Sequence, residues 1–216
     1  MGGRRRDRRL KGSPLPRGFY ARSAIEVAPD LLGRDVVAAS QAGIVRVRLV
    51  EVEAYLGSED PGSHAFRGLT RRNATMFGPP GRLYVYFTYG MHWCMNVVCG
   101  PVGVPTAVLL RAAVVLDGAE IVAGRRPRSA QRDLARGPAR LAQALGIDGS
   151  WDGTDVVRGQ LRLRSGQPPA AAEIRSGPRV GVAGAGGVAP WRFWVDGVAE
   201  VSTYRPAARR AGSTGR

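Results

Sequence analysis

Two segments of this 216-residue chain bring together side chains that can exchange protons, bind metal ions or stack on flat rings. Residues 51–60 contain four acidic side chains and are followed shortly by His64. Residues 83–96 contain three of the six tyrosines and end on an asparagine. If the first segment is a strand, Glu51 and Glu53 are two residues apart and point to the same face.

The paired carboxylates allow three interpretations. Glu53 can act as a general base beside a second carboxylate that raises its pKa. Glu51, Glu53 and Asp60 can instead bind a divalent metal ion in a nuclease, because hard cations prefer oxygen ligands. The third interpretation is an ordinary ion pair between one of the glutamates and Arg46 or Arg48, and spacing alone favours it.

The aromatic residues also carry a functional and a structural interpretation. Tyr84 fits simple packing in the core. Tyr89 lies beside a glycine at an expected hairpin tip, where a ring projects outward and can insert between base pairs. Tyr55, His64 and Tyr86 offer the flat faces that an extruded nucleic-acid base needs above and below it.

The net charge of +15 is concentrated at the two ends of the chain. Residues 1–18 hold seven basic groups against Asp7, and residues 205–216 hold four arginines and no acid. Segments of this composition are typically disordered and bind polyanions such as nucleic acids without base-sequence specificity. They also serve as solubilising tails. We therefore expect basic arms at 1–18 and 207–216 around one domain at 19–206.

Several classes of protein are disfavoured by composition. No run of about 18 apolar residues is present, so no membrane span or membrane partner is expected. Cys94 and Cys99 match no zinc framework, which predicts free thiols in an intracellular, reducing compartment and no metal. Lys11 is the only lysine, which disfavours Schiff-base enzymes. The G-x-x-G at 181–184 lacks a strand–loop–helix context and indicates a turn.

The apolar pattern predicts an α+β domain with an antiparallel sheet. Strands are expected at 35–40, 43–55, 82–88, 92–98, 106–115, 161–164, 180–182 and 191–195. Helices are expected within 19–33, where Ser23 and Glu26 form a capping box, at 117–126 with Asp117 as N-cap, and after Gly137-Pro138. Residues 56–81 are expected to form a long loop.

The strand at 43–55 contains a local conflict. Between residues 43 and 49 the odd positions are apolar and arginines occupy even ones. Between residues 50 and 55 the even positions are apolar, while Glu51, Glu53 and Tyr55 occupy the odd ones. A strand that first buries its odd positions and then places two acids there does not follow the regular alternation of buried apolar and exposed polar residues. Such local conflicts are typical of functional sites.

These motifs together resemble the alkyladenine (3-methyladenine) DNA glycosylase family over roughly residues 19–204. The matching positions are 50–57, 64, 72–73, 76–77, 81–86, 89–91, 94–96, 108–111, 137–141 and 178–182. The resemblance implies a monofunctional glycosylase without a cofactor, built as a single compact α+β domain with a curved antiparallel sheet, an open barrel-like core, flanking helices and a protruding β-hairpin.

The resemblance also implies roles for single residues. Glu53 would activate the attacking water, and Arg111 would orient that water or the acid. Tyr55 and Tyr86 would sandwich the extruded base, and His64 would close the pocket.

Outside this centre, Tyr89 would be the wedge that fills the vacated stack, and Asn96 would crowd the amino group of normal guanine. The implied partner is double-stranded DNA carrying 3-methyladenine, 7-methylguanine, hypoxanthine or ethenoadenine, bound by a monomeric protein of the cytoplasm or nucleoid. A metal-dependent nuclease and a non-catalytic nucleic-acid-binding domain remain the alternatives.

Overall fold

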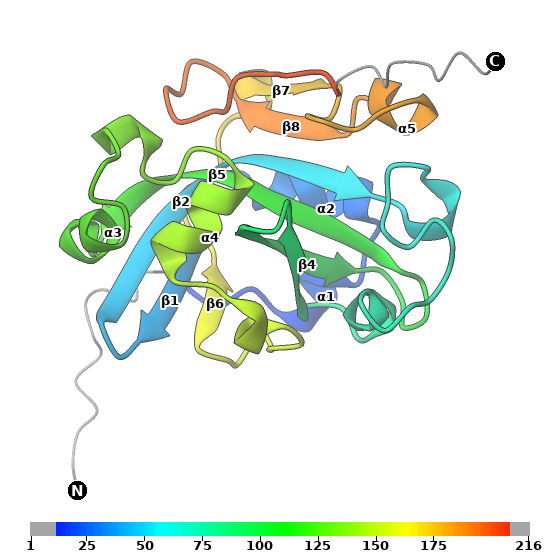
Figure 1. Ribbon diagram of the computed structural model, residues 1–216, viewed down its shortest axis with the longest axis horizontal. Coiled ribbons are helices and arrows are strands. Elements are labelled where there is room, and N and C mark those ends of the chain that lie inside the picture. Colours follow the sequence, from blue (N-terminus) through cyan, green and yellow to red (C-terminus); the bar gives the residue numbers. More distant parts are fainter. Residues whose placement is uncertain (1–11, 208–216) are drawn as a thin grey trace, which may run out of the picture.

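A long strand, β2 (Gly43–Tyr55), is the centre of the fold. The computed structural model describes residues 12–207. Along one edge β2 pairs with β5 (Thr106–Asp117), and along the other it pairs first with β1 (Asp35–Ser40) and then with β8 (Arg192–Val195). Glu53 and Tyr55 lie on β2 and Arg111 lies on the adjacent β5, so part of the predicted site is carried by two neighbouring strands at this centre (Figure 1).

The remaining strands extend this centre into one antiparallel sheet. Its order is β3-β4-β5-β2-β1-β6, and β7 pairs with β8 beside this path. The bounds are β3 Leu83–Thr88, β4 His92–Cys99, β6 Leu161–Arg164 and β7 Ile174–Gly177. The sheet is curved and does not close, which confirms the predicted α+β class.

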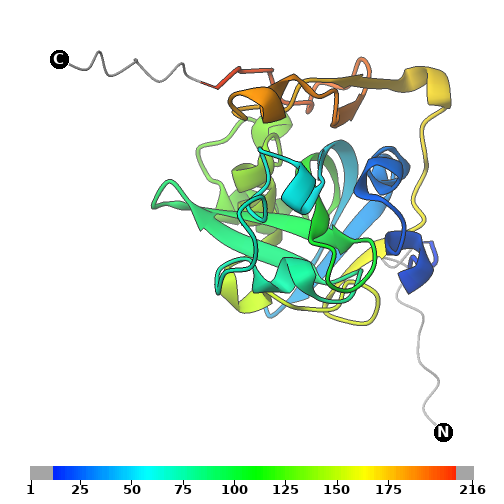
Figure 2. The ribbon, with the colours of Figure 1, turned by 90° about the vertical axis from the view of Figure 1, so that its right-hand side faces the viewer.

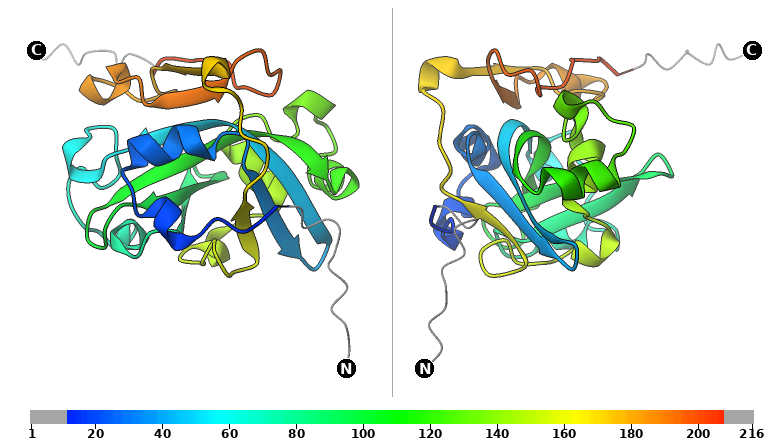
Figure 3. Two further views of the ribbon diagram at one scale, coloured as in Figure 1. Left: turned by 180° about the vertical axis from the view of Figure 1, so that it is seen from behind. Right: turned by 90° about the vertical axis from the view of Figure 1, so that its left-hand side faces the viewer.

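The helices are short and lie on both sides of the sheet (Figures 1 and 3). They are α1 Arg17–Tyr20, α2 Ala24–Leu31, α3 Ala119–Arg125, α4 Pro138–Leu145 and α5 Ala185–Val188. Helix α2 packs on β2 and β5, and α4 packs on β4 and β5. Within residues 12–207, no helix is long and apolar enough to cross a membrane.

The predicted helix ends are confirmed at two helices and wrong at a third. The Ser23–Glu26 capping box starts α2, and Pro138 starts α4, which stops at Gly146 in a left-handed conformation. Asp117 does not cap α3. It is the last residue of β5, and its carboxylate accepts a 2.7 Å hydrogen bond from Arg46, while Gly118 stands at the N-cap.

Two strand predictions near the C-terminus also need correction. Residues 180–182 form a turn rather than a strand, because the chain reverses at Gly181 with a φ of 73°. Strand β7 was not predicted, since only four residues pair and two of them are Ser176 and Gly177. The strand expected at 191–195 is present as β8.

The conflict in β2 is resolved by a β-bulge. Leu49 pairs with Ala113 and Glu51 with Ala112, so Val50 has no partner in the register. The extra residue changes which positions of β2 face the hydrophobic core. Before the bulge these are the odd positions Val45, Val47 and Leu49, and after it they are the even positions Val52 and Ala54. Both glutamates are thereby placed on the opposite side of the strand from the hydrophobic core.

A matching irregularity lies on β5. Leu110 pairs with Val52 and Ala112 with Glu51, so Arg111 falls between the paired residues. Leu110, at an even position, and Ala113, at an odd position, both belong to the hydrophobic core, so the alternation also changes on β5. Arg111 is therefore aimed to the same side as the two glutamates.

The β3–β4 hairpin projects from the body of the domain (Figure 2). Its tip is formed by Tyr89 and Gly90, both in left-handed conformations, with φ of 52° for the tyrosine. Tyrosine adopts this region at a cost in conformational energy. The expected arms fall mainly outside the described residues, but within 12–18 Leu15 is buried and Pro14 bridges to Arg164.

Deletion of Val50 tests the bulge. Without the extra residue, β2 can bury its first half or its second half correctly, but not both, so we expect loss of cooperative thermal unfolding and of near-UV circular dichroism. Val50→Ala keeps the register and should lower the free energy of unfolding by only about 1–3 kcal/mol. A deletion variant as stable as Val50→Ala would contradict the assignment.

Candidate active site

A cavity of about 420 Å³ opens where β2 ends. Its walls come from the loop at 61–64, the β3–β4 hairpin, β5 and the turn at 180–183. The predicted residues that line it are Tyr55, His64, Tyr86, Tyr89, Asn96 and Arg111. Pockets of about 300–1,000 Å³ suit small ligands, so the cavity has room for one flat base.

Glu53 lies directly behind the wall of this cavity and is fully buried. Its Oε2 accepts a hydrogen bond of 2.9 Å from the Tyr55 hydroxyl and lies 3.2 Å from Nη1 of Arg111. Its Oε1 accepts a hydrogen bond of 2.7 Å from the backbone N–H of Val180. All three of these partners line the cavity, so Glu53 is one side chain away from its interior.

Glu51 shares Arg111 with Glu53 and ties it to the C-terminal part of the chain. Its carboxylate accepts hydrogen bonds from Nε of Arg111 at 2.9 Å and from Nε of Arg192 at 2.7 Å. It also accepts bonds of 2.7 and 2.8 Å from the backbone N–H and hydroxyl of Ser202. Arg111 is thus fixed between two carboxylates.

These contacts set the charge states of the centre. Burial alone would lower the pKa of Arg111, but Glu53 and Glu51 raise it above its ordinary value, so the guanidinium stays charged. Burial alone would raise the pKa of Glu51, but Arg111 and Arg192 lower it. Burial, with Glu53 beside it, raises the pKa of Tyr55 well above its ordinary value, so its hydroxyl remains a donor.

The opposite wall is aromatic. His64 and Tyr86 meet edge to face with ring centroids 4.5 Å apart, and Tyr84 stacks on Tyr86 at 5.5 Å. Nδ1 of His64 lies 3.1 Å from the Tyr84 hydroxyl. Tyr84 is fully packed, as predicted, but it also fixes the histidine ring against the cavity.

The backbone of His64 is held by a buried asparagine. Nδ2 of Asn73 donates bonds of 3.0 Å to the carbonyls of His64 and Gly68, and its Oδ1 accepts one from Thr70. The loop at 64–73 therefore has a defined shape although it contains no regular structure beyond turns.

Asn96 and Tyr89 both line the cavity, and their roles stay predictions. Asn96 is 5% exposed, and its amide donates a bond of 3.3 Å to the Tyr84 carbonyl at the cavity wall. Tyr89 is 84% exposed at the tip of the hairpin. Cys94 is buried at the cavity wall with a free thiol, and burial raises its pKa.

The predicted pairing of a glutamate with Arg46 or Arg48 is wrong. Both arginines bind Asp35 instead, at 3.0 and 2.9 Å. Asp35 lies opposite Arg48 in the β1–β2 register, whereas Glu51 and Glu53 lie beyond the part of β2 that pairs with β1.

The metal-site interpretation has no geometric support. Glu51 is neutralised by two arginines, and Asp60 forms a fully buried ion pair with Arg179. Within the described residues 12–207, no group of three His, Cys, Asp or Glu side chains is placed to hold a metal ion.

The sequence analysis did not identify three residues that bind the buried acids Glu51 and Asp60 from far along the chain. Arg179, Arg192 and Ser202 are between 119 and 151 residues away from the acids that they bind. No spacing rule reaches that far, although Arg179 did lie in one of the matched stretches. Asp60 was considered only as a metal ligand.

Comparison with known proteins gives one consistent result. A family model described as methylpurine-DNA glycosylase (MPG) matches residues 18–199. A Streptomyces avermitilis protein named "Putative 3-methyladenine DNA glycosylase" is 55% identical over 206 residues, covering 92% of this chain and 96% of that protein. A Burkholderia lata protein of the same name is 51% identical over 207 residues, covering 94% and 96%.

The ionisation of His64 provides a direct test of the aromatic wall. Burial, with the positive charge of Arg72 nearby, lowers the pKa of His64 below its ordinary 6.5. A proton NMR titration should therefore give a midpoint below 6.5 for this ring. Because the unfolded chain takes up the proton first, the contribution of His64 to stability should fall as pH drops through 6.5. His64→Asn should remove that part of the pH dependence, and a midpoint above 6.5 would contradict the buried placement.

Proposed function

Because the chain belongs to the methylpurine-DNA glycosylase family, we propose that it hydrolyses the N-glycosidic bond of alkylated and deaminated purines with a water molecule activated by Glu53. As a member of this family, the protein is a DNA glycosylase that acts on alkylated bases in base excision repair. The proposal adds the lesions 3-methyladenine, 7-methylguanine, hypoxanthine and ethenoadenine, their extrusion from duplex DNA, and the roles of individual residues.

The arrangement of Glu53 is the observation that carries this proposal. A carboxylate has about four acceptor positions, and two hydrogen bonds together with the ion-pair contact of Arg111 take three of those of Glu53. One position remains for a water molecule. All three partners, Tyr55, Arg111 and Val180, line the cavity, so a water held at Glu53 lies between the acid and a bound nucleoside.

The chemistry requires a negative charge at this place. Cleavage of the N-glycosidic bond creates a positively charged, oxocarbenium-like sugar. The Glu53 carboxylate stabilises that charge and accepts a proton from the attacking water. Arg111 keeps the acid oriented and holds the water. The only lysine of the chain, Lys11, lies outside the described residues, and the proposed nucleophile is water rather than an amine.

The cavity supplies recognition. Tyr55 on one side and Tyr86 with His64 on the other would enclose the extruded base, because flat rings gain stacking energy with any purine. Asn96 would discriminate against the exocyclic amino group of normal guanine. Tyr89, exposed at the projecting tip, would enter the space that the extruded nucleotide leaves.

Glu53→Gln tests the catalytic role. It keeps the size of the side chain but removes the charge, so release of hypoxanthine or 7-methylguanine from duplex oligonucleotides should fall at least ~10²-fold, with DNA affinity changed only a few-fold. Glu59→Gln, the same change at an exposed position, should leave the rate unchanged. Normal turnover by Glu53→Gln would remove Glu53 from the mechanism, and release in excess EDTA would exclude a metal-dependent activity.

Tyr89→Ala tests the wedge. We expect it to weaken binding to a lesion-containing duplex much more than binding to an undamaged one, since only an extruded nucleotide leaves a gap to fill. Tyr204→Ala removes an exposed tyrosine on the C-terminal segment and is the matched control. Equal losses on the two duplexes, measured by fluorescence anisotropy, would argue against a wedge.

A further inference from the structure

A fully buried ion pair lies behind the cavity and has no part in the mechanism above. Two guanidinium nitrogens of Arg179 bind the two carboxylate oxygens of Asp60, each at 2.6 Å, and both side chains are 0% exposed. Arg179 also donates to the carbonyls of Ala54 at 2.9 Å and Gly186 at 2.6 Å. Arg179 therefore joins the end of β2 and the loop at Asp60 to α5.

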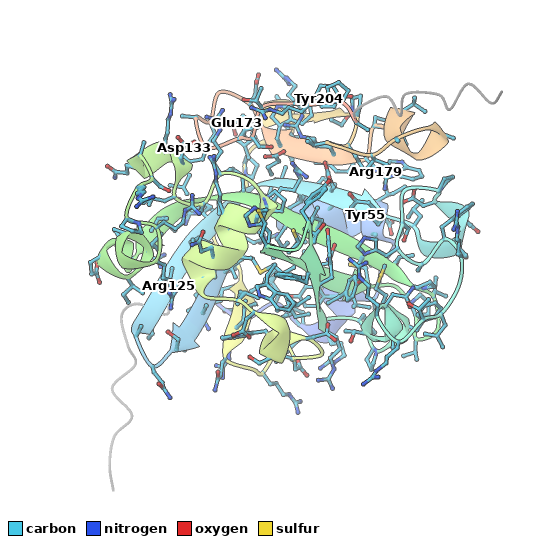
Figure 4. All side chains as sticks on the ribbon, viewed as in Figure 1. Tyr55, Arg125, Asp133, Glu173, Arg179 and Tyr204 are labelled. Atoms are coloured by element: carbon cyan, nitrogen blue, oxygen red, sulfur yellow. The ribbon has the colours of Figure 1, made fainter. Side chains whose placement is uncertain are left out.

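The guanidinium of Arg179 is stacked against Tyr55. Its central carbon lies 4.4 Å from the centroid of the tyrosine ring, and the two labelled side chains lie next to each other in Figure 4. Arg179 is excluded from solvent, whereas Tyr55 lines the cavity. The cation thus covers the side of the ring that faces away from the cavity.

The chain leaves space for this arrangement. Gly62 lines the same cavity, and a Cβ atom at that position would lie 2.6 Å from a guanidinium nitrogen of Arg179. Since the guanidinium is held by Asp60 and two carbonyls, it has little freedom to move away. The place of the cation one ring behind the cavity is therefore fixed.

The buried charges on the β2 side of the cavity cancel. Around Glu51 and Tyr55, three carboxylates and three guanidiniums are at most 5% exposed: Glu51, Glu53, Asp60, Arg111, Arg179 and Arg192. If Asp60 were neutral, this buried set would carry a net positive charge, with the uncompensated cation immediately behind Tyr55. In a medium of low polarity, such a charge acts over the thickness of a stacked ring.

The proposed substrates differ in charge. Nucleotides of 3-methyladenine and 7-methylguanine carry a positive charge on the base, whereas those of hypoxanthine and ethenoadenine are neutral. A base stacked on the cavity side of Tyr55 would lie across the ring from Arg179. An uncompensated Arg179 would repel the charged bases and not the neutral ones.

We infer that Asp60 determines specificity, because its neutralisation of Arg179 behind Tyr55 allows the pocket to accept positively charged alkylated purines together with neutral ones. The inference rests on the proposed function, since it needs the base to stack on Tyr55. It assigns Asp60 a role in substrate range that is separate from the activation of water.

The test compares two lesions in one protein. Affinities are measured in the slow Glu53→Gln background for duplexes that differ only in carrying 7-methylguanine or hypoxanthine. This background removes one buried negative charge from every variant alike, so each comparison is made between variants that share it. Asp60→Asn should lower the affinity ratio of charged to neutral lesion roughly 10-fold or more. The double change Asp60→Asn with Arg179→Met removes both charges and should return the ratio to that of the parent.

Two further variants keep the test decisive. Asp60→Asn leaves a buried unpaired cation and can prevent folding, which thermal unfolding will reveal. In that case Arg179→Met is compared with the double variant: it leaves the carboxylate unbalanced and should raise the ratio. Asp30→Asn, at a surface ion pair with Arg22, is the matched control and should leave the ratio unchanged.

The outcomes separate this inference from the proposed function. If the unmodified protein releases both bases but Asp60→Asn leaves the ratio unchanged, the role of Asp60 is refuted and the glycosylase proposal stands. A ratio in the double variant as low as in Asp60→Asn would also refute it, because shape and not charge would then be responsible. If the unmodified protein releases neither base, the proposed function itself fails.

Discussion

The structure depends on the pairing of acids that are removed from water. A carboxylate buried without a partner would lose its charge or unfold the protein, since the cost of desolvation is several kcal/mol for each ion. Here Arg111 forms ion pairs with both Glu53 and Glu51. Glu51 also binds Arg192 and the hydroxyl of Ser202. This pairing gives the buried Glu53 carboxylate a cationic partner in Arg111 and hydrogen bonds from Tyr55 and Val180.

The same pairing explains why the site is assembled from distant parts of the chain. Arg111 comes from β5, Arg192 from β8 and Ser202 from the segment after it. Arg192 and Ser202 both bind Glu51, so the segment at 192–202 is held against the second half of β2. Gly181 adds to this connection by donating to the carbonyl of Arg205 at 3.0 Å. The cavity wall at 180–183 is therefore stabilised by residues that do not themselves touch its interior.

The bulge in β2 is the local device that makes this arrangement compatible with a core. A regular strand with this sequence would have to bury either the apolar residues of its first half or those of its second half. One extra residue at Val50 allows both halves to face the core, and the acids of the second half then face the cavity side. The conflict in the alternation pattern thus marks the part of β2 that lies next to the cavity, and its physical cause is the change of register at Val50.

The sequence alone determined the elements whose signals are local. Alternation predicted β1 and β2 with their observed bounds, the capping box predicted the start of α2, and Pro138 and Gly146 predicted both ends of α4. The family resemblance located Glu53 and the six cavity residues, although their roles stay predictions. Local signals failed at Asp117 and at residues 180–182, where contacts from elsewhere decided the conformation.

Only the tertiary structure decided which charges meet. Arg46 and Arg48 are the basic residues nearest in sequence to Glu51 and Glu53, yet both bind Asp35. The glutamates bind Arg111 and Arg192, which come from other strands. The pairing of Asp60 with Arg179 is equally remote in sequence. Alternation and capping act between neighbours along the chain and can be read from it, whereas an ion pair depends on distance in space, which is set by how the whole sheet is put together.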